Sequence, residues 1–122
     1  VQDYTSGRHF EDAVSYAFYP VDLHTRTGVK PKPLKRGIVP TVPISSLIPK
    51  DSWNIIVAGR CISSDRLANS ALRVQAACMG MGQAAGATAA LAVRNKTTPS
   101  SVPLEKIHGL LREHNAIVPE KS

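Results

Sequence analysis

The sequence predicts a small α/β fold, and two neighbouring segments carry that prediction. Residues 53–59 read Trp-Asn-Ile-Ile-Val-Ala-Gly, a mostly apolar run that ends in a glycine. Such a run is typical of a strand buried on both faces of a parallel or mixed sheet. After a polar loop, residues 70–94 are rich in alanine, which favours helix, and we predict one long helix there despite three glycines. With 122 residues, the chain allows one small domain with a modest core.

Two segments within the first 47 residues carry patterns of extended chain. Residues 12–17 fit either a short helix or a strand, and residues 21–24 alternate apolar with polar side chains as a half-buried strand does. Three prolines interrupt residues 38–49, and a proline lacks the donor that a central strand needs. We therefore expect extended segments at 14–24 and 38–47.

Residues 25–37 predict a solvated basic loop. Five of the fifteen Lys and Arg residues fall there: Arg26, Lys30, Lys32, Lys35 and Arg36. Nucleic-acid surfaces usually interleave such a patch with aromatic side chains, and the aromatic residues of this sequence lie outside the loop. Despite the net charge of +6, we do not expect a nucleic-acid partner.

The helix predicted at 70–94 is apolar around almost its whole circumference. Gly80, Gly82 and Gly86 each cost roughly 1 kcal/mol relative to alanine inside a helix, so something should need their missing side chains. Gly82 and Gly86 share a face on which another backbone can approach, and we expect them to pack against a sheet. Polar residues such as Arg73 interrupt the run, so a membrane span is not expected. A helix of this kind is normally buried in a larger protein, which predicts that the chain is a piece of something longer.

The last segment predicts an amphipathic surface helix. Its apolar stripe comprises Leu104, Ile107, Leu110 and Leu111. Ser101 is placed to cap this helix, and Pro103 would lie in its first turn.

The loop that leads into the helix at 70–94 is a candidate site for an anion or an electron-rich ring. Free amide groups at a helix start carry a partial positive charge, and Ser70 can cap that start. An ordinary connection between a strand and a helix explains the same pattern equally well. Asp22 and His24 point to one side if their segment is a strand, which fits a structural hydrogen bond or an acid–base pair. The scattered histidines and two cysteines do not predict a metal site.

Several blocks of the sequence together resemble the C-terminal end of FAD-dependent oxidoreductases of the glutathione-reductase and fumarate-reductase type. The strongest blocks are Asn54–Ser63, Ser70–Val74 and Met81–Val93, which include Ala-Gly-Arg-Cys-Ile-Ser and Gly-Gln-Ala-Ala-Gly. Weaker blocks extend the resemblance over Arg8–Ala13, Tyr19–His24, Val42–Pro49, Leu110–Leu111 and Asn115–Ile117.

The resemblance implies that the chain is the C-terminal fragment of an FAD-binding, Rossmann-like domain. Residues 1–47 would be the tail of a substrate or cap region, and residues 48–122 would belong to the FAD-binding domain. The strand at 53–59 would join the sheet of that domain, and the start of the long helix would face the isoalloxazine ring. The closing helix would complete the fragment.

The resemblance also implies roles for single residues around FAD. Gly59 would let the backbone approach the ribityl chain, and Arg60 would contact the cofactor. Ser70, Arg73 and Val74 would line the ring, although Arg73 also fits pairing with an acidic neighbour. Asp22 and His24 would approach the substrate.

Two hypotheses follow for the function. In the first, the chain completes the flavin site of an oxidoreductase that acts on a small molecule, with the remainder of the parent chain as its partner. The sequence contains no Gly-x-Gly-x-x-Gly, so the fragment alone is expected to bind FAD poorly and to be inactive. In the second, the chain is an interaction module that forms an oligomer through its small-residue helix. Exposed apolar surface predicts self-association in either case, and the sequence leaves the cellular compartment open.

Overall fold

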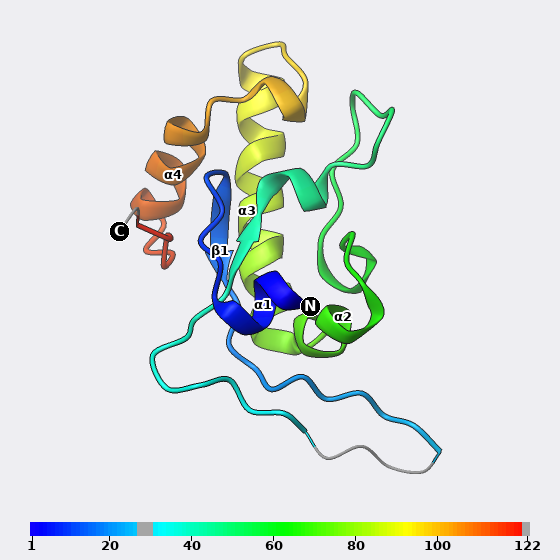
Figure 1. The fold of residues 1–122 in the computed structure, drawn as a ribbon. Helices are drawn as coiled ribbons and strands as arrows, with labels where there is room; N and C mark the ends of the chain where they lie inside the picture. Colours follow the sequence, from blue (N-terminus) through cyan, green and yellow to red (C-terminus); the bar gives the residue numbers. More distant parts are fainter. Residues whose placement is uncertain (27–30, 121–122) are drawn as a thin grey trace.

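One long helix is the element against which most of the others pack (Figure 1). The computed structural model describes residues 1–26 and 31–120. The helices and strands, in chain order, are α1 (Gln2–Ser6), β1 (Ala13–Tyr16), β2 (Thr41–Pro43), α2 (Arg66–Leu72), α3 (Gln75–Arg94) and α4 (Leu104–Glu113). Three short 3-10 turns connect them: η1 (Ile44–Leu47), η2 (Gly59–Cys61) and η3 (Pro99–Ser101).

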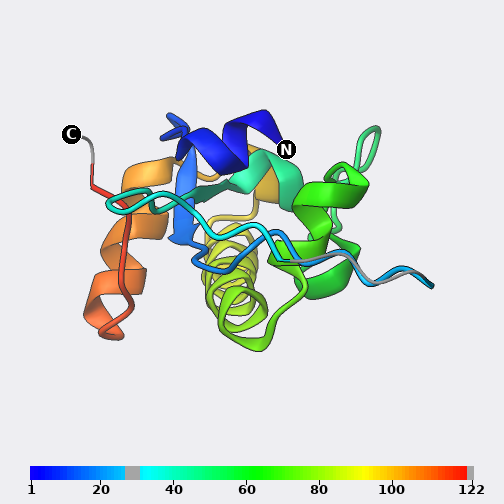
Figure 2. The same cartoon turned by 60° about the horizontal axis from the view of Figure 1, so that its bottom comes forward.

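The strands β1 and β2 form an antiparallel pair that lies against α3 (Figures 1 and 2). The register pairs Ser15 with Val42 and Tyr16 with Thr41. These strands confirm extended chain in part of each segment where the sequence predicts it, but residues 44–47 differ from the prediction because they form the 3-10 turn η1. Val21 differs from the prediction, because it makes a single antiparallel bridge to Lys32 instead of belonging to a strand.

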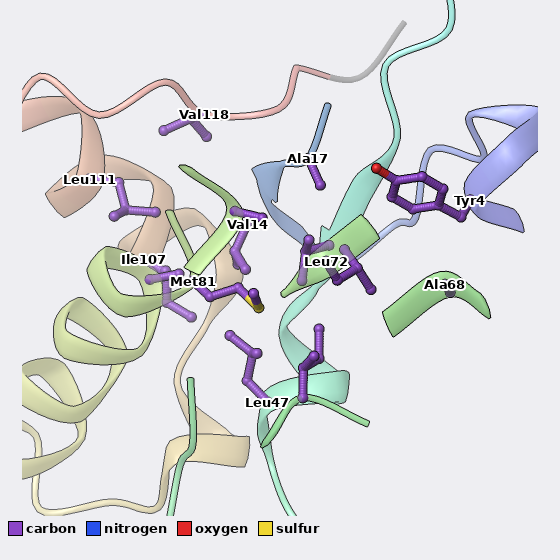
Figure 3. Packing of buried hydrophobic residues seen from close by; sticks show 14 of the residues in the cluster. Tyr4, Val14, Ala17, Leu47, Ala68, Leu72, Met81, Ile107, Leu111 and Val118 are labelled. Carbon is purple, nitrogen blue, oxygen red and sulfur yellow. The ribbon is translucent and has the colours of Figure 1, made fainter. Parts of the chain in front are cut away.

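The hydrophobic core lies between α3, α4 and the two-stranded sheet (Figure 3). Met81 of α3 is fully buried together with Val14, Leu47 and Ile107, which come from β1, η1 and α4. The same cluster contains Tyr4 and Val118, so residues on both sides of position 47 contribute to one core. The expected division into 1–47 and 48–122 therefore stays a prediction about a larger protein.

Residues 53–59 do not form the predicted strand. Trp53 is 72% exposed and Ile55 is 52% exposed, and the only sheet in the described part of the chain is the pair β1–β2. The amide of Val57 donates to the carbonyl of Leu47 at 2.8 Å, which holds the segment beside η1 without a ladder. A strand buried on both faces needs neighbours on both edges and covering elements on both faces, and residues 1–26 and 31–120 do not supply them.

The predicted helix at 70–94 is two helices, and Ser70 does not cap either one. Asp65 caps α2, because its carboxylate accepts from the amides of Leu67 at 3.0 Å and Ala68 at 2.9 Å. The chain leaves helical geometry at Val74, where ψ is 155°, before α3 begins. An acidic cap five residues upstream satisfies the first amides of α2, so Ser70 falls inside that helix.

Helix α4 confirms the predicted amphipathic stripe. Ile107 and Leu111 are buried, and the ring of His108 ties the helix to β1 through a 2.7 Å contact with the carbonyl of Ala13. The predicted cap is wrong, because the hydroxyl of Ser101 lies 2.9 Å from that of Thr98 and Pro103 occupies the N-cap without a capping side chain.

Among the glycines of α3, Gly80 is the one at which a neighbouring residue leaves little room for a side chain. A Cβ atom added there would lie 3.2 Å from the Cβ of Ser15, whose buried hydroxyl has no hydrogen-bond partner. At Gly82 and Gly86 an added Cβ would meet no described atom within 4 Å. The expected packing of these two glycines against a sheet is therefore absent from the described part of the chain. Their side of α3 also carries Met79, which is 71% exposed, and Val93, which is 80% exposed.

The three glycines should respond differently to alanine. G82A and G86A should each raise the free energy of unfolding by about 1 kcal/mol, because alanine favours helix and the added methyl meets open space. G80A should give less of this gain than G82A, because its added methyl group would lie 3.2 Å from the Cβ of Ser15 and crowd β1. Urea unfolding followed by circular dichroism measures all three. Equal stability of G80A and G82A would contradict the close approach at Ser15.

Candidate functional site

Asp22 joins the N-terminal part of the chain to the junction between α2 and α3. Its backbone amide donates to the hydroxyl oxygen of Ser70 at 3.1 Å, and its backbone carbonyl accepts from the guanidinium of Arg73 at 3.3 Å. Its carboxylate lies 3.3 Å from Nε2 of His24. Four of the residues singled out from the sequence therefore meet in one cluster, which we call the Asp22 cluster: Asp22, His24, Ser70 and Arg73.

Ser70 has a structural role in this cluster. It is buried, and its hydroxyl donates to the carbonyl of Leu67 at 2.6 Å while accepting from the amide of Asp22. Both hydrogen-bonding functions of the hydroxyl are thus used within the chain. The contact holds the segment at Asp22 against the last turn of α2.

Arg73 contacts an acidic neighbour, but the contact is with the backbone of that neighbour and not with its carboxylate. The guanidinium donates to the carbonyl oxygen of Asp22, which leaves the carboxylate of Asp22 to His24. A guanidinium has five donors, so this one bond leaves others for a bound molecule.

The pair of Asp22 and His24 has one covered and one open member. The side chain of Asp22 is 17% exposed, whereas that of His24 is 76% exposed. A carboxylate that contacts one ring nitrogen fixes the orientation of the imidazole. The imidazole is therefore the member of the pair that a substrate from solvent can reach.

The first turn of α3 has no side-chain cap. Val74 is the N-cap residue, and its carbonyl accepts the first bond of the helix from the amide of Cys78 at 3.0 Å. The amides of residues 75–77 precede that bond and have no partner within the helix. Gln75 and Ala76 are exposed, so this end of α3 presents a partial positive charge at the surface.

Gly59 lies beside the same end of α3. Its φ of +84° is in the left-handed region, where an L side chain is strained. A Cβ atom there would lie 3.9 Å from the thiol of Cys78 in the first turn of α3. The neighbouring Arg60 is exposed and extends the positive charge of this region.

Asp65 is a residue whose importance the sequence reasoning missed. As the cap of α2 it fixes the helix that carries Ser70 into the Asp22 cluster. In the 122-residue chain on its own, a hydrogen bond from the terminal amine of Val1, followed by one from the amide of Ala68, lowers the pKa of its carboxyl group. An acidic residue directly before the first helical turn is the signal that could have revealed it.

Residues 1–26 and 31–120 contain no group of three or more His, Cys, Asp or Glu side chains that could hold a metal ion. Helix α3 is long and apolar enough to cross a membrane by length and composition alone, a criterion that core helices of soluble proteins also meet.

The comparisons with known proteins give one match. Residues 1–111 match the model of a family described as FAD dependent oxidoreductase. No curated protein and no solved structure matches the chain.

The cap of α2 gives a test of how the Asp22 cluster is anchored. D65A should lower the free energy of unfolding by about 1 kcal/mol at neutral pH, whereas D65N should fall between D65A and the unchanged chain, because asparagine also caps helices but carries no charge. Since the folded pKa of Asp65 lies below its ordinary 3.8, the contribution of its ionised form is present above that value and is lost as the pH falls through the folded pKa. Urea unfolding at neutral and acidic pH should therefore show the D65A effect shrinking in acid. A constant difference would contradict the charged cap.

Proposed function

Because the chain belongs to the family of FAD-dependent oxidoreductases, we propose that it is the C-terminal part of such an enzyme and completes its flavin site. FAD is the cofactor of the family, and when bound it supplies the hydride- or electron-transfer chemistry. The task of this chain is then to position the flavin and tune its electrostatic surroundings. The glutathione-reductase and fumarate-reductase type is the branch that its sequence blocks favour.

The uncapped start of α3 is the observation that carries the proposal. Its free amides offer donors and a partial positive charge, which fit the electron-rich edge of an isoalloxazine ring near N1 and O2. The turn at Gly59 lies against the same helical turn and brings backbone without a side chain close to it. The residues present thus fit the flavin end of FAD.

The candidate residues have distinct roles in this proposal. Val74 and Arg73 border the ring at the start of α3, and Arg73 has donors left after its bond to Asp22. Gly59 and Arg60 approach the ribityl chain. Ser70 supports the ring site through its bond to Asp22 instead of touching the ring itself.

The Asp22–His24 pair is the proposed contact with a small-molecule substrate. His24 is open to solvent and its ring is oriented by a mostly covered carboxylate, as an acid–base group requires. Its segment is bonded to Arg73, one residue before the N-cap of α3. A substrate held by His24 would therefore lie on the side of the junction where the flavin is proposed.

The remainder of the parent chain is proposed to supply the pyrophosphate-binding motif and the cover for α3. The exposed Trp53 and Ile55 would then join the parent sheet, and the open face at Gly82 and Gly86 would receive another element. Without these parts, we propose that the chain alone is inactive.

An interaction module is the second candidate, and the exposed face of α3 favours it. Met79, Gly82, Gly86 and Val93 lie on that face, and a second copy of the chain can cover it as well as a parent domain can. This candidate predicts a tight oligomer without flavin.

The visible absorption spectrum of the parent protein, purified without added cofactor, separates the two candidates. A flavin band in the parent that is missing from the 122-residue chain supports the proposed function. A colourless parent that stays colourless after incubation with FAD contradicts it. Light scattering of the chain then shows whether it forms the oligomer that the second candidate requires.

A charge placed at the start of α3 tests the flavin position. In the flavin-loaded parent, Q75E should lower the two-electron midpoint potential by roughly 20 mV, because a carboxylate there opposes negative charge on the flavin. Q83E is the matched control, since Gln83 is also exposed on α3 but lies two turns further along. A carboxylate in the first turn favours the helix, so Q75E should fold normally. Equal potentials in the two variants would place the ring elsewhere.

A further inference from the structure

A ribbon of two extended segments projects from the body of the chain. We call residues 17–26 and 31–40 the basic arm. Ala17 and Val21 at its inner end belong to the core, and a turn between Lys35 and Ile38 interrupts the second segment. The outer parts of the two segments run side by side away from the body (Figures 1 and 2). The amide of Ala17 donates to the carbonyl of Pro40 at 2.9 Å at its base. Further out, Val21 and Lys32 exchange two backbone hydrogen bonds of 3.0 and 2.9 Å.

The basic arm has a strong excess of positive charge. Arg26, Lys32, Lys35 and Arg36 are exposed, and the ion pairs within the described residues involve none of them. Its one acidic residue, Asp22, is mostly covered and contacts His24. The four positive charges are therefore not neutralised by ion pairs, and their electrostatic potential attracts negatively charged groups.

Exposed apolar side chains accompany the charges on the basic arm. Phe18 is 68% exposed and Val39 is 43% exposed, and both lie near its base. Aromatic residues and arginine together are characteristic of protein interfaces. Pro31 and Pro33 restrict the backbone of the second segment, which lowers the entropy lost when a partner docks.

We propose that the basic arm is a docking surface for a carboxylate-rich segment of another protein. The contacts of Asp22 with Ser70 and Arg73 tie the arm to the junction that leads into α3, so such a partner would dock next to the proposed flavin site. Docking itself does not depend on that proposed function.

The arrangement of charges favours an acidic protein over other anions. Five surface hollows are lined by residues outside the arm, so its charges surround no hollow among these that would hold a small anion. Single-stranded nucleic acid prefers a series of stacking rings along its path. The exposed aromatic rings of the described arm are Phe18 and Tyr19, which are adjacent in the sequence and lie away from its basic residues.

Fluorescence anisotropy with labelled poly-L-glutamate of about 20 residues tests the proposal on the full 122-residue chain. The arm variant is K32E/K35E/R36E. The control is K50E/R66E/K106E, which removes the same charge from exposed positions elsewhere. Arg66 and Lys106 lie in first helical turns, where glutamate is favourable, so the control should fold.

The arm variant should weaken binding of poly-L-glutamate by about tenfold, whereas the control should change it less than about twofold. Equal weakening in both variants would overturn the proposal, because binding would then follow net charge alone. Tighter arm-dependent binding of a 20-nucleotide RNA, or of vesicles containing phosphatidylserine, would overturn it in favour of that partner. Circular dichroism confirms that both variants are folded.

Discussion

The fold depends on burying one face of α3. Ala77, Met81, Ala84 and Thr88 are almost completely covered along that face, and β1, η1, η2, η3 and α4 all contact the helix. Most of these side chains are small, so the neighbouring backbones come close and dispersion contacts accumulate over a short distance. Removing this face would leave the two-stranded sheet and α4 without a common partner, since neither forms a core alone.

The opposite face of α3 is exposed although its residues are small or apolar. A soluble monomer seldom leaves a long run of small and apolar residues in water, and this face presents Met79, Gly82, Gly86 and Val93. Membership of the FAD-dependent oxidoreductase family offers a reason, because a helix of a cofactor-binding domain needs elements on more than one side. The exposed Trp53 and Ile55 have the same explanation: their sequence is suited to the interior of a sheet.

Local patterns predicted the elements that local forces determine. The stripe from Leu104 to Leu111 predicted α4 correctly, because helical periodicity is set within a few residues. The strand predicted at 53–59 was wrong, because a buried strand forms only where other strands pair with it. Ser70 and Asp22 are 48 residues apart in the sequence, so their contact could not be read from any spacing. Both had been singled out, yet only the tertiary fold shows that Ser70 binds a backbone amide and caps no helix.

The backbone of Asp22 has a mechanical consequence for the molecule. Its amide donates a hydrogen bond to Ser70 in α2. Its carbonyl accepts one from Arg73, which lies in the short connection before α3. The arm, α2 and the connection between α2 and α3 are thus joined at one residue, Asp22. A variant that displaces the backbone of Asp22 would therefore break the bond to Ser70 and the bond to Arg73 together.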